Sequence, residues 1–173
     1  MENKNKTSIP ELTTERLILR QLLDTDVQEI FLLRSDPVIN KYLDRPPCKS
    51  LDDASKFIDK IKNNGTLYWA ISLKEHEKLI GTICLFDISE ELKKGEIGYE
   101  LLPEFQGKGI MNEATKKIME YALHPLGLTT INAFTHKDNK PSISLLIKLK
   151  FENQHARGEI NDDMVLFQFQ EKS

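Results

Sequence analysis

The chain has 173 residues, of which 39% are hydrophobic and 29% are charged, and its formal net charge at pH 7 is -3. This balance is typical of a globular protein, and the net negative charge gives no overall positive potential for non-specific binding of nucleic acid. The first ten residues are polar, which indicates a flexible tail, and no apolar run approaches membrane-spanning length. We therefore expect a single domain over residues 1–173, cytoplasmic, with neither a nucleic-acid nor a membrane partner.

The residues that most often bind metals are scattered along the sequence. Cys48 and Cys84 lack the spacing of a metal or redox motif, so reduced thiols are expected. His136 follows a predicted strand and is a candidate for lining a pocket, as is His155, but nothing in the spacing supports a metal site. We predict no metal site.

The first third of the chain reads as one strand followed by helices. Residues 12–23 predict the strand, and Asp24 is placed to cap the helix that follows. Residues 37–43 predict a second, short helix. A third helix begins after Ser50, a capping residue, and ends at Gly65.

Three strands follow in an antiparallel meander, over residues 67–74, 79–88 and 95–102. The third alternates with a period of two, which is typical of a strand with two different faces. Its apolar face holds Ile97, Tyr99 and Leu101, and its other face holds Glu96, Gly98 and Glu100. Pro103 ends this strand, because proline cannot donate to a central ladder.

A glycine turn then precedes a helix that carries an apolar stripe over residues 110–122. Gly107-Lys108-Gly109 leaves the first backbone N–H groups of that helix without a capping side chain. Those groups, the positive end of the helix dipole and the Lys108 ammonium predict a site for a phosphate-sized anion. The alternative is a connecting turn that only starts a helix.

The remaining elements complete an alternating pattern. Residues 129–135 predict a strand, and the helix before it makes this strand parallel to its predecessor. Another helix starts near Asn139. Residues 151–157 and 163–169 predict a closing hairpin.

The segment Gln106-Gly107-Lys108-Gly109-Ile110-Met111 resembles motif A of the GNAT (Gcn5-related) N-acetyltransferases, written Q/R-x-x-G-x-G/A. The longer segment 97–106 resembles the branch that acetylates N-terminal amines of ribosomal proteins. Met111 stands where that motif has glycine or alanine, and methionine is flexible enough to fit an irregular gap. Other phosphate-binding motifs fit worse, because a P-loop and a dinucleotide fingerprint both need glycines that this turn lacks.

The resemblance extends over residues 12–170 and implies the GNAT fold. That fold belongs to the α/β class in the broad sense, and its sheet is mixed, as in α+β proteins. It would have about seven strands, mostly antiparallel with a parallel and splayed central pair, and about four helices.

The resemblance also implies acetyl-coenzyme A (acetyl-CoA) as the acetyl donor and co-substrate. The pantetheine arm would lie in the splay, against the backbone of Leu101 and Leu102. The pyrophosphate would lie on the N–H groups of Gln106, Gly107, Lys108, Gly109, Ile110 and Met111. Asn139 would contact coenzyme A, and Ser142 would protonate the leaving thiolate. The alternative is that Asn139 and Ser142 only cap their helix.

Two carboxylates are candidates for the general base. Glu96 and Glu100 share one face of their strand, and Glu100 lies nearest the expected splay. Either would take the amine proton through water; alternatively, both are solvent-facing charges. Glu159 is a third candidate by similarity to ribosomal-protein acetyltransferases. The segment after Asn139 contains no tyrosine, which is the proton donor in many relatives, so the general acid remains open.

The predicted function is acetyl transfer from acetyl-CoA to a primary amine, with the α-amine of a protein N-terminus favoured. Such an amine, of pKa about 7.7–8.0, loses its proton at pH 7 for roughly 1 kcal/mol, against about 4.6 kcal/mol for lysine. Two alternatives stay open: a small-molecule amine such as an antibiotic or a polyamine, and a non-catalytic module that binds coenzyme A. The expected partner is the amine acceptor, and the expected state is a monomer or a homodimer.

Overall fold

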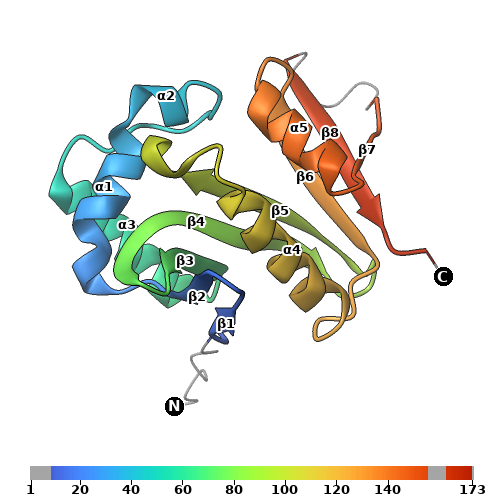
Figure 1. Ribbon diagram of the computed structural model, residues 1–173, viewed down its shortest axis with the longest axis horizontal. Coiled ribbons are helices and arrows are strands. Elements are labelled where there is room, and N and C mark those ends of the chain that lie inside the picture. Colours follow the sequence, from blue (N-terminus) through green and yellow to red (C-terminus); the bar gives the residue numbers. More distant parts are fainter. Residues whose placement is uncertain (1–8, 156–162, 173) are drawn as a thin grey trace.

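The computed structural model describes residues 9–155 and 163–172 of the chain. One eight-stranded sheet runs through it in the order β1-β2-β3-β4-β5-β6-β8-β7 (Figure 1). Its strands are β1 (Leu12–Thr13), β2 (Leu17–Gln21), β3 (Leu67–Leu73), β4 (His76–Ser89), β5 (Lys94–Leu101), β6 (Thr130–His136), β7 (Glu152–Asn153) and β8 (Met164–Gln170). Among the strands of the described residues, only β5 and β6 pair in parallel, which confirms the predicted mixed sheet with a central parallel pair.

Five α-helices connect these strands in the described part of the chain. They are α1 (Val27–Ser35), α2 (Pro37–Asn40), α3 (Leu51–Asn64), α4 (Ile110–Leu123) and α5 (Lys140–Lys148), with short 3-10 turns η1 (Asp24–Asp26) and η2 (Pro103–Phe105). The predicted caps of α3 are confirmed. Ser50 Oγ accepts from the Asp53 N–H at 3.2 Å, and Gly65 ends the helix at φ 71°, a conformation that favours glycine. None of these helices is long and apolar enough to cross a membrane.

The predicted first strand is in fact a short hairpin, which raises the strand number from about seven to eight. Thr14 makes the turn: its N–H donates to Leu17 O at 3.0 Å, and its hydroxyl accepts from the Leu17 N–H at 2.9 Å. The helix start also differs from the prediction. Residues 24–26 form η1, and the buried Asp26 carboxylate accepts from the Leu23 N–H and pairs with Arg20 at 2.8 Å. The charge-assisted pair with Arg20 makes the burial of Asp26 possible. Asp26, and not Asp24, is therefore the residue that fixes the start of the helical segment.

Two apolar clusters lie on opposite faces of the sheet. One holds Trp69, Ile97 and Ile131 with the buried faces of α4 and α5, and the other holds Tyr68 and Ala70 with α1 and α3. Adjacent residues of β3 thus enter different cores, as the pleat requires. In Figure 1, α4 and α5 lie along the same side of the sheet. The predicted tail through residue 8, the segment 156–162 and Glu159 within it lie outside the described residues.

Candidate active site

A cavity opens where β5 and β6 part. The two strands pair only at Lys94–Thr130, Gly95–Ile131 and Glu96–Asn132, although β5 continues to Leu101 and β6 to His136. Figure 1 shows them diverging from this end toward the other. The cavity between them has a volume of about 110 Å³ and is lined by Tyr42, Leu43, Ile97, Gly98, Tyr99, Ala133, Phe134, Thr135, His136, Asn139, Ser142 and Met164. The parting leaves backbone groups of both strands without a strand partner, which suits an extended ligand.

The predicted glycine turn lies between η2 and α4. Gly107 and Gly109 have φ values of 74° and 75°, a region that other residues adopt only with strain. Gly109 is the N-cap residue of α4, and no N-cap side chain is there to accept from the first backbone N–H groups of the helix. A Cβ on Gly109 would meet only Arg16 Nη2, at 3.5 Å, so the space before the helix is open. Met111 packs partly against the core, as a flexible filler can.

Arg16, from the turn between β1 and β2, clamps this glycine turn. Its Nη1 donates to Lys108 O at 3.0 Å and its Nε to Glu113 Oε2 at 2.7 Å. Burial by itself would raise the pKa of Glu113, but hydrogen bonds from Thr14 and Arg16 outweigh it and lower that pKa. Sequence reasoning missed this residue, because 92 positions separate Arg16 from Lys108 and no local pattern connects them.

The end of β5 is held by side-chain and backbone hydrogen bonds. Gln106 Nε2 donates to Leu101 O at 2.9 Å, which ties the motif glutamine to the strand. The Leu102 N–H donates to Ile80 O on β4 at 2.9 Å, and Leu102 O accepts from the Phe105 N–H. Successive residues of a strand direct their backbone groups to opposite neighbours, so the Leu101 groups face the parting and the Leu102 groups do not.

Asn139 and Ser142 reach the same cavity from α5. Asn139 Oδ1 accepts from the Ser142 N–H at 3.3 Å, which is the cap that the sequence allowed for. The Ser142 hydroxyl lies 2.8 Å from the hydroxyl of Tyr99 on β5. Burial raises the pKa of Tyr99 to about 12, and its hydrogen bond to Ser142 opposes that shift. Tyr99 therefore stays protonated at neutral pH. The sequence predicted its face of the strand but not this contact.

Glu96 lies on the opposite face of β5 from Tyr99, next to the point where the strands part. Burial, reinforced by the negative charge of Asp87, raises the pKa of Glu96 to about 7. Within the described residues its carboxylate has no hydrogen-bond or ion-pair partner. Its neighbour on β6, Asn132, accepts from Gln168 Nε2 at 2.9 Å. A carboxylate that titrates near neutral pH can accept a proton from an amine.

Glu100, the other predicted base, is differently placed. Its Oε2 accepts from Arg45 Nη2 at 2.5 Å, and its Oε1 accepts from Thr82 Oγ1 at 3.3 Å. The two members of the ion pair are 6% and 19% exposed. Arg45 also donates to Asn40 Oδ1 at 2.7 Å, so the loop between α2 and α3 is tied to β5.

Two aromatic rings that line the cavity contact each other. Tyr42, just after α2, stacks on His136 at the end of β6, with 5.0 Å between ring centroids. His136 Nδ1 accepts from the Asp138 N–H at 3.1 Å, which fixes this ring in place. The prediction that His136 lines a pocket is confirmed. Because Tyr42 and Arg45 belong to one loop, that loop forms one wall of the site.

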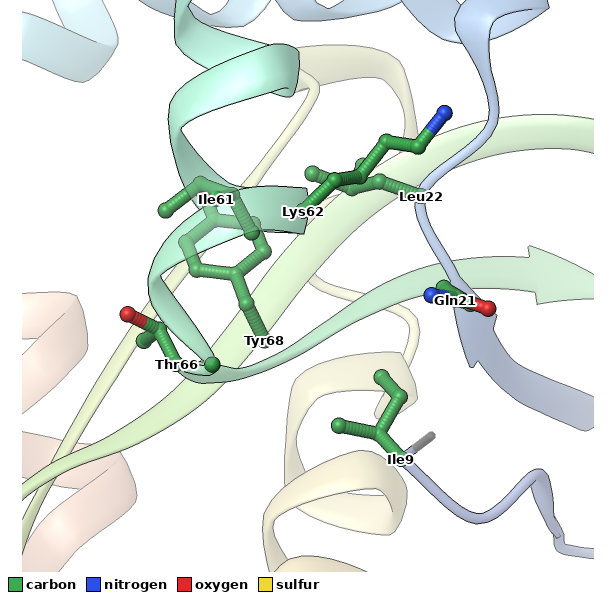
Figure 2. Close-up of a pocket in the computed structure, with 8 residues that line it drawn as sticks. Ile9, Gln21, Leu22, Ile61, Lys62, Thr66 and Tyr68 are labelled. Carbon is green, nitrogen blue, oxygen red and sulfur yellow. The ribbon is translucent and has the colours of Figure 1, made fainter. Parts of the chain in front are cut away.

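A second cavity, of about 20 Å³, lies beside the end of α3 and the start of β3 (Figure 2). Lys62 there pairs with Asp24 at 2.7 Å, and the Tyr68 hydroxyl donates to Thr82 at 3.0 Å, so both polar ends already have partners. Among the described residues, no group of three or more His, Cys, Asp and Glu side chains is arranged to hold a metal ion. The candidate active site is therefore the cavity between β5 and β6.

Comparisons with known proteins agree with this geometry. A family model described as an acetyltransferase (GNAT) domain matches residues 16–152. An uncharacterized N-acetyltransferase of Bacillus subtilis, YoaA, is 34% identical over 152 residues, which cover 84% of each chain. The spermidine N(1)-acetyltransferase of Escherichia coli K12 is 26% identical and covers 82% of this chain and 74% of its own.

One solved structure with the same fold contains acetyl-CoA. The microcin C7 self-immunity acetyltransferase MccE, in complex with acetyl-CoA and AMP, superimposes with a TM-score of 0.75 at 22% identity. The match covers 91% of this chain and 93% of that one.

Proposed function

Because the chain belongs to the GNAT acetyltransferase family, we propose that it transfers the acetyl group of acetyl-CoA to the α-amine of a peptide or protein N-terminus. The observation that carries the choice of acceptor is the Glu96 carboxylate, whose pKa is raised to about 7 beside the parting of β5 and β6.

The donor would bind along the glycine turn and the splay. The uncapped first turn of α4 and the positive φ values of Gly107 and Gly109 support a pyrophosphate site, with Ile110 and Met111 contributing backbone N–H groups. Lys108 adds a positive charge. The pantetheine arm would pair with the β6-facing backbone of β5, in which Leu101 is the last residue.

The raised pKa of Glu96 bears on which amine the site can accept. A general base works best when its pKa lies near the operating pH, and a pKa of about 7 meets that condition. Transfer of a proton from an α-amine of pKa about 7.7–8.0 to a base of pKa about 7 costs roughly 1 kcal/mol. The same transfer from a lysine-like amine costs about 4.6 kcal/mol. Glu96 therefore suits an α-amine better than an alkyl amine.

The reaction then proceeds by direct attack. The amine nitrogen forms a bond to the thioester carbonyl carbon, and the carbon–sulfur bond breaks with its electron pair on sulfur. The amine proton passes to Glu96, directly or through one water. Ser142, at the cavity wall, protonates the departing thiolate. The ion pair with Arg45 makes Glu100 a weaker candidate for the base, since a bound carboxylate must first release its partner.

A small-molecule amine is the second candidate. The similarity to the Escherichia coli spermidine N(1)-acetyltransferase favours it, since that relative covers 82% of this chain. A non-catalytic module that only binds coenzyme A would not need the proton transfers proposed for Glu96 and Ser142.

An amine panel separates these candidates. Release of free coenzyme A is followed with three acceptors: a lysine-free peptide with a free α-amine, the same sequence N-acetylated and carrying one lysine, and spermidine. The proposal expects the highest kcat/KM for the α-amine. Preference for spermidine would favour the second candidate, and acetyl-CoA binding without release under any condition would leave a binding module.

A further inference from the structure

The two hydroxyls that meet in the cavity come from different elements of the fold. Tyr99 lies on β5 and Ser142 in the first turn of α5, and the 2.8 Å hydrogen bond between them crosses the parting of the strands. Both line the cavity with Asn139. Building on the proposed function, we propose that Tyr99 is a positioning residue for catalysis, which donates to Ser142 Oγ and so leaves the Ser142 proton free for the departing sulfur.

The direction of this hydrogen bond follows from proton accounting. A phenol and a serine hydroxyl each carry one proton and can also accept. Ser142 is the only hydrogen-bond partner of the Tyr99 hydroxyl in the described residues. The phenol is the stronger acid of the two and so the better donor, and the aliphatic serine oxygen is the better acceptor. Tyr99 is therefore the donor, and burial keeps its proton in place by raising its pKa to about 12.

This orientation leaves the Ser142 proton available for a bond to the ligand. Its Oγ accepts from Tyr99 while the Asn139 cap fixes the backbone of the same turn, so neither contact uses the serine proton. That proton can point toward the thioester sulfur, where negative charge develops as the carbon–sulfur bond breaks. A donor that is already oriented costs no reorganisation during the reaction. Sulfur receives the serine proton, and Ser142 Oγ regains a proton from solvent, to which Glu96 returns the one that it took from the amine. No serine alkoxide remains, and Tyr99 keeps its own proton.

Tyr99→Phe removes the hydroxyl and keeps the ring that packs against the core. We expect kcat to fall about 10-fold or more, as for loss of one preorganised donor, while the KM for acetyl-CoA stays within about twofold. Tyr99→Phe/Ser142→Ala should be no slower than Ser142→Ala alone, since both act through one proton. Tyr121→Phe is the matched control: it removes a phenol hydroxyl from the same apolar cluster, on α4, and should leave kcat unchanged.

The outcomes separate this inference from the function on which it rests. A parent enzyme that acetylates an amine, with Tyr99→Phe at the parental kcat, would overturn the role of Tyr99 and leave the function intact. Equal losses that add up in the double variant would also overturn it, because they indicate independent effects. A parent enzyme without turnover on any amine would overturn the proposed function and this inference together.

Discussion

Arg45 donates from Nη2 to the Glu100 carboxylate at 2.5 Å, and this contact joins the loop after α2 to the end of β5. The carboxylate also accepts from the Thr82 hydroxyl, which in turn accepts from the Tyr68 hydroxyl at 3.0 Å. A buried charge pair with satisfied neighbours holds its geometry, although it adds little net stability. The same loop carries Tyr42, which lines the cavity, so the ion pair positions one wall of the site.

Glu100→Gln should act on this loop more than on the chemistry. The amide retains an oxygen for Arg45 but removes the charge that compensates the guanidinium. We expect a loss of about 1–3 kcal/mol in the free energy of unfolding and a raised acceptor KM, with a smaller change in kcat. Urea unfolding and steady-state kinetics measure both. A loss of kcat of about 10²–10⁴-fold with unchanged acceptor KM would instead assign Glu100 as the base.

Glu96→Gln should remove the general base. The parent enzyme needs ionised Glu96, so kcat/KM should fall as the pH drops below about 7, the pKa of Glu96. We expect the variant to lose about 10²–10⁴-fold in turnover and to keep only the acid limb of the substrate amine, at its pKa of about 7.7–8.0. A pH series with the peptide substrate measures the limb. An identical acid limb in Glu96→Gln would assign it to another group.

The raised pKa of Glu96 also predicts how stability depends on pH. The folded protein holds this proton up to about pH 7, whereas the unfolded chain releases it near the ordinary value of 4.5. The folded state therefore binds more protons between these values, and Glu96 lowers the free energy of unfolding as the pH rises through that window. Glu96→Gln should become more stable relative to the parent from pH 4.5 to 7. A difference that stays constant across that range would contradict the raised pKa.

Gly109→Val tests the phosphate turn. Valine at φ 75° would be strained by about 1–2 kcal/mol and would put a branched side chain into the open space before α4. We expect the variant to fold and to lose coenzyme A binding in titration calorimetry. Lys108→Ala should only weaken binding, because the backbone donors remain.

The matched control for Gly109→Val is Gly65→Val. Gly65 ends α3 at φ 71° and has no neighbouring atom within 4 Å of an added Cβ. A valine there would therefore be under similar backbone strain, but away from the site. The affinity of Gly65→Val for coenzyme A should equal that of the parent. If both valine variants lost binding equally, backbone strain, and not blocked access, would explain the result.

Coenzyme A should stabilise the folded protein. A ligand at 100 times its dissociation constant adds about 2.7 kcal/mol to the free energy of unfolding. The midpoint of thermal unfolding should therefore rise with coenzyme A, and less so in Gly109→Val. An unchanged midpoint at millimolar coenzyme A would contradict a donor site at this turn.

Local patterns were enough to predict most of the fold. The alternation in β5 and the cap and glycine of α3 act within a few residues, so their chemistry is visible in the sequence. The split of the first strand was not predictable, because it depends on the Thr14 side chain bonding its own turn. Helix and strand order then indicated the parallel pairing of β5 and β6.

The site was predictable only in part, because its contacts join distant segments. The glycine turn is local, and so is the Asn139 cap of α5. Arg16 meets Lys108, Arg45 meets Glu100, and Tyr99 meets Ser142 only once the sheet has formed. Glu96 and Glu100 look alike on the strand, and only folding gives one an arginine and the other a raised pKa.

The most direct measurement is a single-turnover assay with enzyme in excess over acetyl-CoA, with and without a peptide that carries a free α-amine. Free thiol and the mass of the peptide are followed together. The account predicts that thiol appears only when the peptide is present, in step with acetylation of its N-terminus, and that Glu96→Gln slows both. Tight binding of acetyl-CoA with no acetylated peptide would contradict it.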